Sequence, residues 1–333
     1  MLVGESALTF ELVPDWEQLP AGWSHGDVAG VATDSQDRVY VFNRGEHPVI
    51  VYDRDGRFLR SWGEGVFTRP HGITIHKDIV YCADDTDHTV RAFTLRGELL
   101  WTLGTPHQPS DTGYSPEAWT NLRSIRRGGG PFNRPTRLSI APGGDMYVSD
   151  GYGNARVHRF SAQCELLRSW GEPGDAPGQF NLPHSVWAHT DGRIFVCDRE
   201  NDRVQIFSPD GELLDMWTGL TRPGDLFIDA DGHVFVGEMA WEPGATSMAG
   251  RPYTELRTPQ LSIRDMDGRL LARWGGPDPC APGSFASPHG LWLDSRGDLY
   301  VAEVTHTALS RSNRWHPACH SLQKFARRGG PVS

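Results

Sequence analysis

Three histidines occupy the same position in a repeated sequence pattern, which makes them candidates for a shared metal site. Each follows a proline and precedes an alternating apolar run, as in Arg-Pro-His-Gly at His71, Leu-Pro-His-Ser at His184 and Ser-Pro-His-Gly at His289. Catalytic zinc uses three protein ligands and leaves a fourth position for water or substrate. The three histidines therefore predict a zinc centre if the fold brings them together.

The intervening copies of the pattern carry a small residue in place of the histidine. That position holds Ala29, Thr136 and Gly224, so every second copy offers an imidazole. A single histidine after a proline can merely bond a nearby carbonyl, and each of the three, taken alone, favours that structural interpretation. The alternation through the whole set favours metal binding, as a hypothesis from one sequence.

A second group of polar residues follows the next strand of each repeat. Arg44, Arg199 and Tyr152 interrupt a series of acidic residues, and we expect them on the same face as the histidines. A guanidinium group binds a carboxylate bidentately, so the arginines suit a carboxylated substrate. A tyrosine beside cations has its phenolate favoured and can act as a general base. The alternative for each arginine is an ion pair with an acid of a neighbouring repeat.

The acidic residues of this series are expected to be structural, because aspartate side chains cap turns. They are Asp84, Asp150, Asp198, Glu238 and Glu303.

Short strands must position all of these residues. The chain repeats units of four β-type runs divided by Asp, Asn and Gly, beginning with residues 30–33, 39–42, 49–52 and 58–62. A period of roughly 40 to 65 residues with four strands per unit is typical of a β-propeller. The sequence thus predicts an all-β, six-bladed β-propeller in a single domain, residues 1–333. The approximate blades are residues 22–65, 66–104, 131–171, 180–219, 220–276 and 285–326.

The sixth unit supplies only three strands before the chain ends. A lone alternating run at residues 8–13 precedes the first unit and is the natural fourth strand. Pairing of this strand with the last blade would remove exposed sheet edges. We therefore expect the N-terminal strand to close the propeller.

The composition excludes several classes of partner. The formal net charge is −10, whereas nucleic-acid-binding proteins usually carry a basic stripe. The sequence contains neither a secretory signal nor an apolar run long enough to span a bilayer. The five cysteines are odd in number and widely spaced, which predicts mostly free thiols. We expect a cytoplasmic protein that binds neither nucleic acid nor membrane, and its oligomeric state is left open.

Three insertions interrupt the repeats at residues 105–130, 240–258 and 304–319. They are long for blade connections, and loops of this length are usually functional or disordered. We expect them to act as lids.

Over nearly its whole length the chain resembles a known family. The resemblance is carried by the strings at residues 43–47, 69–72, 149–156, 179–185 and 198–201. These strings are similar to those of the NHL-repeat six-bladed propellers and, among them, of the peptidyl-α-hydroxyglycine α-amidating lyases. The resemblance implies that the three histidines hold zinc, that Arg44 and Arg199 lie in the site, and that Tyr152 takes the proton of the substrate's α-hydroxyl. The implied reaction splits an N-acyl-α-hydroxyglycine, its hydroxyl on zinc, into a primary amide and glyoxylate.

The chain also departs from this family at informative positions. Gly290 stands where the animal enzymes carry an acidic ligand of a structural calcium, which puts calcium in doubt here. Gly153 replaces a half-cystine, and together with the missing signal this makes peptide-hormone amidation an unsuitable role. Arg137 replaces an acid and adds a cation for substrate binding. We interpret the chain as a bacterial-type relative whose substrate has changed.

Three hypotheses follow for the function. The first is a zinc-dependent lyase acting on a small carboxylated α-hydroxy amide, with Tyr152 as base and Arg44, Arg199 and Arg137 around the carboxylate. The second keeps the metal but uses water as nucleophile, giving a lactonase-like hydrolase. The third is a non-catalytic binding propeller without stoichiometric metal.

Replacing His184 with alanine is expected to abolish metal loading while leaving the fold intact, because apolar packing between blades stabilises a propeller. Elemental analysis of protein purified without chelators measures the metal, and circular dichroism the fold. A zinc content equal to that of the wild type would remove His184 from the site.

Overall fold

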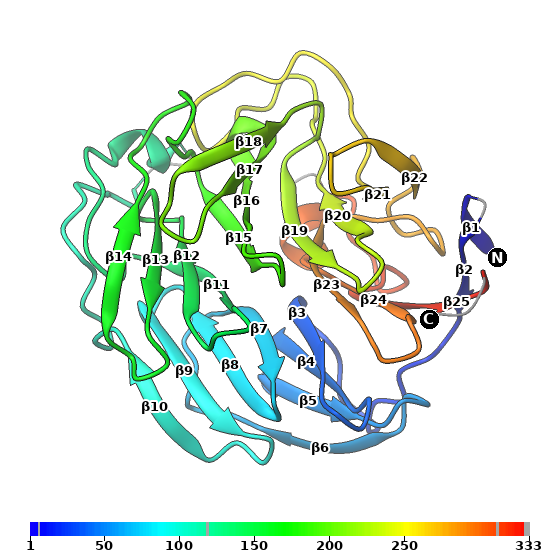
Figure 1. Cartoon of the computed structure of the whole chain (residues 1–333). Coiled ribbons are helices and arrows are strands. Elements are labelled where there is room, and N and C mark those ends of the chain that lie inside the picture. The colour runs from blue at the N-terminus through cyan, green and yellow to red at the C-terminus, as the bar shows by residue number, and fades with distance from the viewer. Residues whose placement is uncertain (6, 118–119, 311–312, 330–333) are drawn as a thin grey trace. The chain divides into compact units, whose positions relative to one another are not determined.

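The computed structural model describes residues 1–5, 7–117, 120–310 and 313–329. Two short stretches of the insertions, 118–119 and 311–312, lie outside the described residues. Within the described ranges the strands form six antiparallel sheets. The predicted fold class is confirmed: the chain is an all-β protein with the six blades of a β-propeller, one sheet per blade (Figure 1).

The chain divides into two compact units of three blades each. Unit 1 comprises Met1–Pro70, Asp225–Ala240 and Thr258–Ser333, and unit 2 comprises His71–Gly224 and Trp241–Arg257. That the chain forms one domain stays a prediction.

Unit 1 holds the first, fifth and sixth blades. Its elements are β1 (Leu2–Glu5), β2 (Leu8–Val13), β3 (Asp27–Thr33), β4 (Val39–Arg44), β5 (Val49–Tyr52), β6 (Phe58–Trp62), β19 (Pro223–Ile228), β20 (Val234–Glu238), β21 (Gln260–Arg264), β22 (Leu270–Gly275), β23 (Pro288–Leu293), β24 (Leu299–Glu303), α1 (Thr305–Ser310) and β25 (Leu322–Arg327).

The N-terminal strand closes the last blade, as predicted. Strand β2 pairs with β25 in antiparallel register, with Phe10 opposite Arg327 and Val13 opposite Lys324. Strand β1 extends the sheet to the order β1-β2-β25-β24-β23, an outer strand that the sequence did not predict (Figure 1). Strand β1 lacks a clear alternation of buried and exposed residues because it covers little of the core. Its Leu2 is 65% exposed.

Unit 2 holds the second, third and fourth blades. Its elements are β7 (Pro70–His76), β8 (Ile79–Asp84), β9 (Thr89–Thr94), β10 (Leu99–Leu103), η1 (Asn121–Ser124), β11 (Pro135–Ile140), β12 (Met146–Asp150), β13 (Arg156–Phe160), β14 (Leu166–Trp170), β15 (Pro183–Ala188), β16 (Ile194–Asp198), η2 (Arg199–Asn201), β17 (Arg203–Phe207) and β18 (Leu213–Trp217). Its cores lie between consecutive blades, where apolar residues of β8 and β9 meet those of β11 and β12.

The sequence had suggested that the repeated histidine position lies just before the first strand of its blade. In the structure it lies inside that strand, as the second residue. In β15 the pairing shifts from Pro183–Asp198 to Ser185–Cys197, so His184 is the extra residue of a β-bulge. The same shift surrounds His289 in β23. A bulge bends the strand and re-aims one side chain, which frees these imidazoles from the regular alternation.

The recurring acidic residues cap turns, which confirms their structural interpretation in three blades. Asp150 accepts hydrogen bonds from the backbone N–H of Asn133, and Asp198 accepts one from Asn181. Glu303 accepts the N–H of Ala286 in the sixth blade. Each carboxylate therefore ties the end of a second strand to the loop that enters the first strand of its blade.

The cysteines correct one expectation. The cysteines were expected to be mostly free, and three of the five are, but Cys280 and Cys319 form a disulfide across 39 residues of unit 1 that their spacing did not indicate. Their approach depends on how residues 304–319 fold back, which spacing cannot reveal. The other cysteines, all within the described chain, are free: Cys82, Cys164 and Cys197. Because disulfides persist mainly in oxidising compartments, the cysteines no longer support a cytoplasmic location, which stays a prediction. No helix among the described residues is long and apolar enough to cross a membrane.

Replacing Phe10 with alanine should lower the free energy of unfolding by about 3–5 kcal/mol, the usual cost of deleting a buried aromatic ring. Phe10 is fully buried and its ring packs 5.8 Å from that of Trp274 and 6.0 Å from that of Phe235. Denaturant unfolding followed by tryptophan fluorescence measures the change. Leu2→Ala on the exposed β1 is the control, and equal losses in both variants would show that β2 is not part of the core.

Candidate functional site

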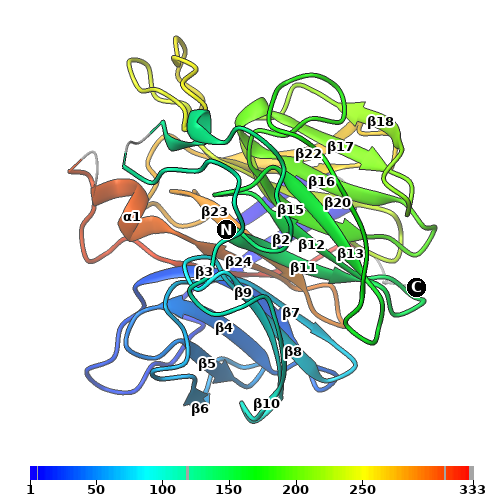
Figure 2. The same ribbon diagram turned by 90° about the vertical axis from the view of Figure 1, so that its left-hand side faces the viewer.

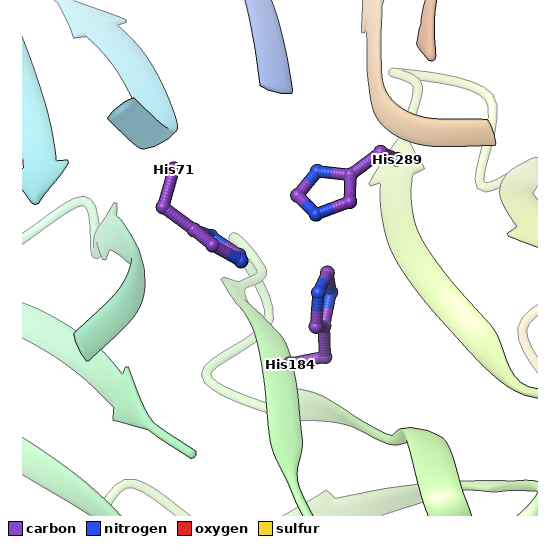
Figure 3. Close-up of side chains that lie close together, drawn as sticks. All are labelled: His71, His184 and His289. Atoms are coloured by element: carbon purple, nitrogen blue, oxygen red, sulfur yellow. The ribbon is translucent and has the colours of Figure 1, made fainter. Parts of the chain in front are cut away.

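Two of the three candidate histidines lie side by side within unit 2. His71 and His184 are the second residues of β7 and β15, and each is 2% exposed. Their ring centroids lie 4.8 Å apart with an interplanar angle of 65° (Figure 3). Burial of polar rings is unfavourable without hydrogen-bonding partners. The partners of each ring therefore indicate which nitrogen carries the proton.

The backbone of the intervening repeat position orients each ring. The Nδ1 atom of His71 lies 2.7 Å from the carbonyl oxygen of Thr136, and that of His184 lies 2.5 Å from the carbonyl oxygen of Gly224. A carbonyl can only accept, so Nδ1 carries the proton and Nε2 keeps its lone pair. This is the state in which histidine binds a metal through Nε2, with the second nitrogen held by a backbone carbonyl.

His289 belongs to unit 1 and has the same local geometry. It is the second residue of β23, is 5% exposed, and its Nδ1 lies 2.7 Å from the carbonyl oxygen of Ala29. Ala29, Thr136 and Gly224, noted in the sequence only as small residues, are thus the acceptors that orient the histidines. The donor set fits a divalent transition metal, because three neutral imidazoles that each offer an Nε2 lone pair are typical zinc ligands.

Tyr152 joins the histidine pair of unit 2. It follows β12 and is 7% exposed. Its hydroxyl lies 3.1 Å from Nε2 of His184, to which it donates, and accepts a hydrogen bond of 3.0 Å from Nη1 of Arg199. The structure therefore brings together Tyr152, Arg199 and His184, which the sequence had assigned to one site.

Arg199 is fixed at both ends of its guanidinium group. It is 4% exposed in η2, its Nε donates to Oε1 of Glu200 at 2.9 Å, and its Nη2 lies 3.1 Å from Sδ of Met248. Its ion-pair partner is the next residue in the chain and not an acid of a neighbouring blade. Burial alone would raise the pKa of Glu200, but the charges of Arg222 and Arg199 outweigh it and lower that pKa to about 2.

The remaining predicted arginines occupy different surroundings. Arg137 is 4% exposed on β11, next to Thr136. Arg44 ends β4 in unit 1, where its Nε donates to the carbonyl oxygen of Pro70 at 2.8 Å and its Nη1 lies 3.9 Å from Asp27. Asp27 belongs to the same blade as Arg44, so this ion pair differs from the alternative considered from the sequence.

Arg134 is a site residue that the sequence reasoning missed. Its guanidinium carbon lies 5.4 Å from the ring centroid of Tyr152, the same distance as that of Arg199. Its Nη1 donates to the hydroxyl of Tyr114 at 2.8 Å, and its Nη2 lies 3.6 Å from Asp85. The sequence feature that could have identified Arg134 is its position directly before the repeated proline, which Arg69 and Arg222 share.

Two insertions of unit 2 meet over Tyr152. Leu122 and Ile125 of the first insertion form a buried cluster with Tyr152, Leu182 and Met248, the last from the second insertion. Figure 2 shows the segment around η1 beside the loop that follows β20. Tyr152 thus has two guanidinium groups near its ring and apolar side chains packed against it. Such a site can move a proton and stabilise negative charge away from bulk water.

The six antiparallel sheets and the repeated sequence pattern define a β-propeller. Residues 180–207 match the NHL repeat. NHL repeat-containing protein 3 of Mus musculus is 31% identical over 310 residues, which are 86% of this chain and 79% of that protein. The chain belongs to the NHL-repeat family.

The chain is also similar to peptidyl-alpha-hydroxyglycine alpha-amidating lyase 1 of Drosophila melanogaster, with 29% identity over 267 residues, 75% of this chain. The match spans only 45% of that lyase. Among solved structures, a gluconolactonase from Xanthomonas campestris superimposes with a TM-score of 0.60 at 13% identity, over 92% of this chain and 88% of the other. At that identity the likeness concerns the fold alone.

Proposed function

We propose that the protein is a metal-dependent lyase that cleaves the C–N bond of a small carboxylated N-acyl-α-hydroxy amide. The observation that carries this proposal is the Tyr152 hydroxyl, held between Arg199 at 3.0 Å and His184 at 3.1 Å. The name of the Drosophila relative, an amidating lyase, supports the reaction type. Some relatives, such as NHL repeat-containing protein 3, have names that state no activity. The proposal therefore rests on the chemistry of the site and not on the fold.

The proposed metal is zinc, with His71, His184 and His289 as ligands. In the proposed site each of the three imidazoles would offer one nitrogen to the ion. Their common register and their common Nδ1 contact with a backbone carbonyl support this assignment. Zinc bound there would lower the pKa of the substrate's hydroxyl group.

The protein's own residues would handle the proton and the charge. With the histidine nitrogens given to the metal, Tyr152 would no longer donate to His184 and would act as the phenolate, which the neighbouring guanidinium groups favour, to accept the proton of the α-hydroxyl. Arg199 contacts the hydroxyl of Tyr152, and Arg134 lies over its ring. Both guanidinium groups would stabilise the negative charge that develops on the substrate. The C–N bond then breaks, the nitrogen takes up a proton, and the products are a primary amide and glyoxylate. All substrate atoms are recovered in these two products, and no water is consumed.

The carboxylate of the substrate would be bound by arginines. Each Nη atom of Arg199 carries a second hydrogen beyond the one directed at Tyr152 or Met248. That edge of the guanidinium group matches a carboxylate in geometry and charge. We propose Arg44 and Arg137 as further cationic contacts, because both are buried or nearly so and carry charges opposite to the substrate's.

The products formed in ¹⁸O-labelled water test the reaction type. With N-benzoyl-α-hydroxyglycine and zinc-loaded protein, we expect benzamide without solvent ¹⁸O, measured by mass spectrometry, and an equal amount of glyoxylate, measured by a glyoxylate assay. The label is read in the amide because the aldehyde oxygen of glyoxylate exchanges with water. Tyr152→Phe, which keeps the ring and removes the hydroxyl, should lower kcat by about 10²–10⁴-fold, the usual contribution of a general base. Labelled benzoate would instead show a hydrolase, and absence of turnover in the presence of bound zinc would argue for a binding propeller.

Replacing Arg199 with alanine should raise KM for the carboxylated substrate more than for an uncharged analogue such as the corresponding methyl ester. The reason is that only the carboxylate gains a charge-assisted bidentate contact. Steady-state kinetics on both compounds measures the difference, with Arg193→Ala on the blade surface as control. Equal losses for the two compounds would refute carboxylate binding by Arg199.

A further inference from the structure

Glu200 connects the arginine of the proposed site to the loop that covers it. Its side chain is completely buried, and its two oxygens have different partners. Oε1 accepts hydrogen bonds from Nε of Arg199 and Nη2 of Arg222, both at 2.9 Å. Oε2 accepts the backbone N–H of Met248 at 3.1 Å and the hydroxyl of Tyr253 at 3.4 Å. One carboxylate thus holds two blade arginines on one oxygen and the loop on the other.

The covering loop, residues 241–257, has a defined structure of its own. Isolated bridges pair Trp241 with Arg257 and Thr246 with Pro252, and the rings of Trp241 and Tyr253 are stacked 5.4 Å apart. Asp202 anchors its base by accepting a hydrogen bond of 3.2 Å from Nε1 of Trp241. The loop is therefore a folded hairpin whose position depends on Glu200 and Asp202.

The tip of this loop lies against the groups proposed for catalysis. Met248 contacts Nη2 of Arg199 through its sulfur and packs in the apolar cluster around Tyr152. Gly250, with a φ of 83°, lies so close to Arg123 of the first insertion that an added Cβ would stand 2.6 Å from its Cδ. The two insertions thus meet above Tyr152 and leave it and Arg199 almost fully enclosed.

We propose that Glu200 is a positioning residue that holds loop 241–257 closed on Arg199 and so confines the site to small substrates. This inference rests on the proposed function for its kinetic part. Glu200 touches no reacting atom: it acts through Arg199, which reaches the Tyr152 hydroxyl, and through Met248, which contacts Arg199 and packs in the apolar cluster with Tyr152. The charge of Glu200 is needed, because without it Arg199 and Arg222 would face each other as buried like charges. A substrate with a short acyl group fits such an enclosed site, whereas an extended peptide chain requires the loop to open.

The test compares Glu200→Gln, which keeps the size and removes the charge, with Glu200→Asp, which keeps the charge, and with Glu212→Gln on the surface. Hydrogen exchange of the amides in residues 241–257, read by mass spectrometry, reports loop closure without any need for activity. We expect faster exchange there in Glu200→Gln, partial protection in Glu200→Asp and wild-type exchange in Glu212→Gln. Unchanged exchange in Glu200→Gln would overturn the proposal.

Kinetics on N-acetyl-α-hydroxyglycine and on a tripeptide ending in α-hydroxyglycine tests the positioning role. The wild type should prefer the small compound. Glu200→Gln should raise the KM and lower the kcat for this compound, so that kcat/KM falls on the order of 10- to 100-fold, the scale expected when a catalytic group is misplaced. The preference over the tripeptide should shrink. A variant that only loses stability would keep the wild-type KM and preference, and that result would refute positioning.

Met248→Ala keeps the proposal testable if Glu200→Gln does not fold, because it leaves the Glu200 network intact and removes only the contact of the loop tip. We expect it to reduce the preference for the small compound, and an unchanged preference would count against the proposal. If the wild type turns over neither compound, the proposed function fails, while the exchange data still decide whether Glu200 holds the loop.

Discussion

The candidate site depends on one repeated hydrogen bond, from a histidine Nδ1 to the carbonyl oxygen of the intervening repeat position. It occurs at His71, His184 and His289, with Thr136, Gly224 and Ala29 as acceptors. Because a carbonyl cannot donate, this bond fixes the tautomer and directs Nε2 away from the backbone. At His184 and His289 a β-bulge releases the ring from the regular alternation of the strand.

The blades and the loops contribute different parts of the candidate site. The strands supply groups with fixed directions, and the acids that cap their entry loops keep those strand ends in place, as Asp198 does for Asn181. The insertions supply apolar cover, through Leu122 and Met248, over a hydroxyl that the blades position. Glu200 belongs to both parts, since its carboxylate binds Arg199 and the backbone of Met248. Rigid elements thus carry the polar chemistry, and the loops set its accessibility.

The relatives show how little the fold alone says about activity. A propeller named as a gluconolactonase and this chain share their architecture at 13% identity, and one fold can carry unrelated reactions. What supports a lyase is local: a tyrosine hydroxyl with a guanidinium on one side and a histidine Nε2 on the other. The same blades with a different residue at position 152 would present a different chemistry.

The sequence by itself determined the four strands of each repeat, the blade number, the closing strand and the shared repeat position of the histidines. These follow from local signals: alternation along a strand has a period of two, turn residues bound it, and a repeat places equivalent residues equivalently. It also assigned His184, Tyr152 and Arg199 to one site, and the structure brings these three side chains into contact. Only the tertiary structure decided the bulge at His184, the Cys280–Cys319 bond, and the roles of Arg134 and Glu200. These depend on contacts between residues distant in the chain or on loops without periodicity, where neither spacing nor hydropathy specifies which side chains meet.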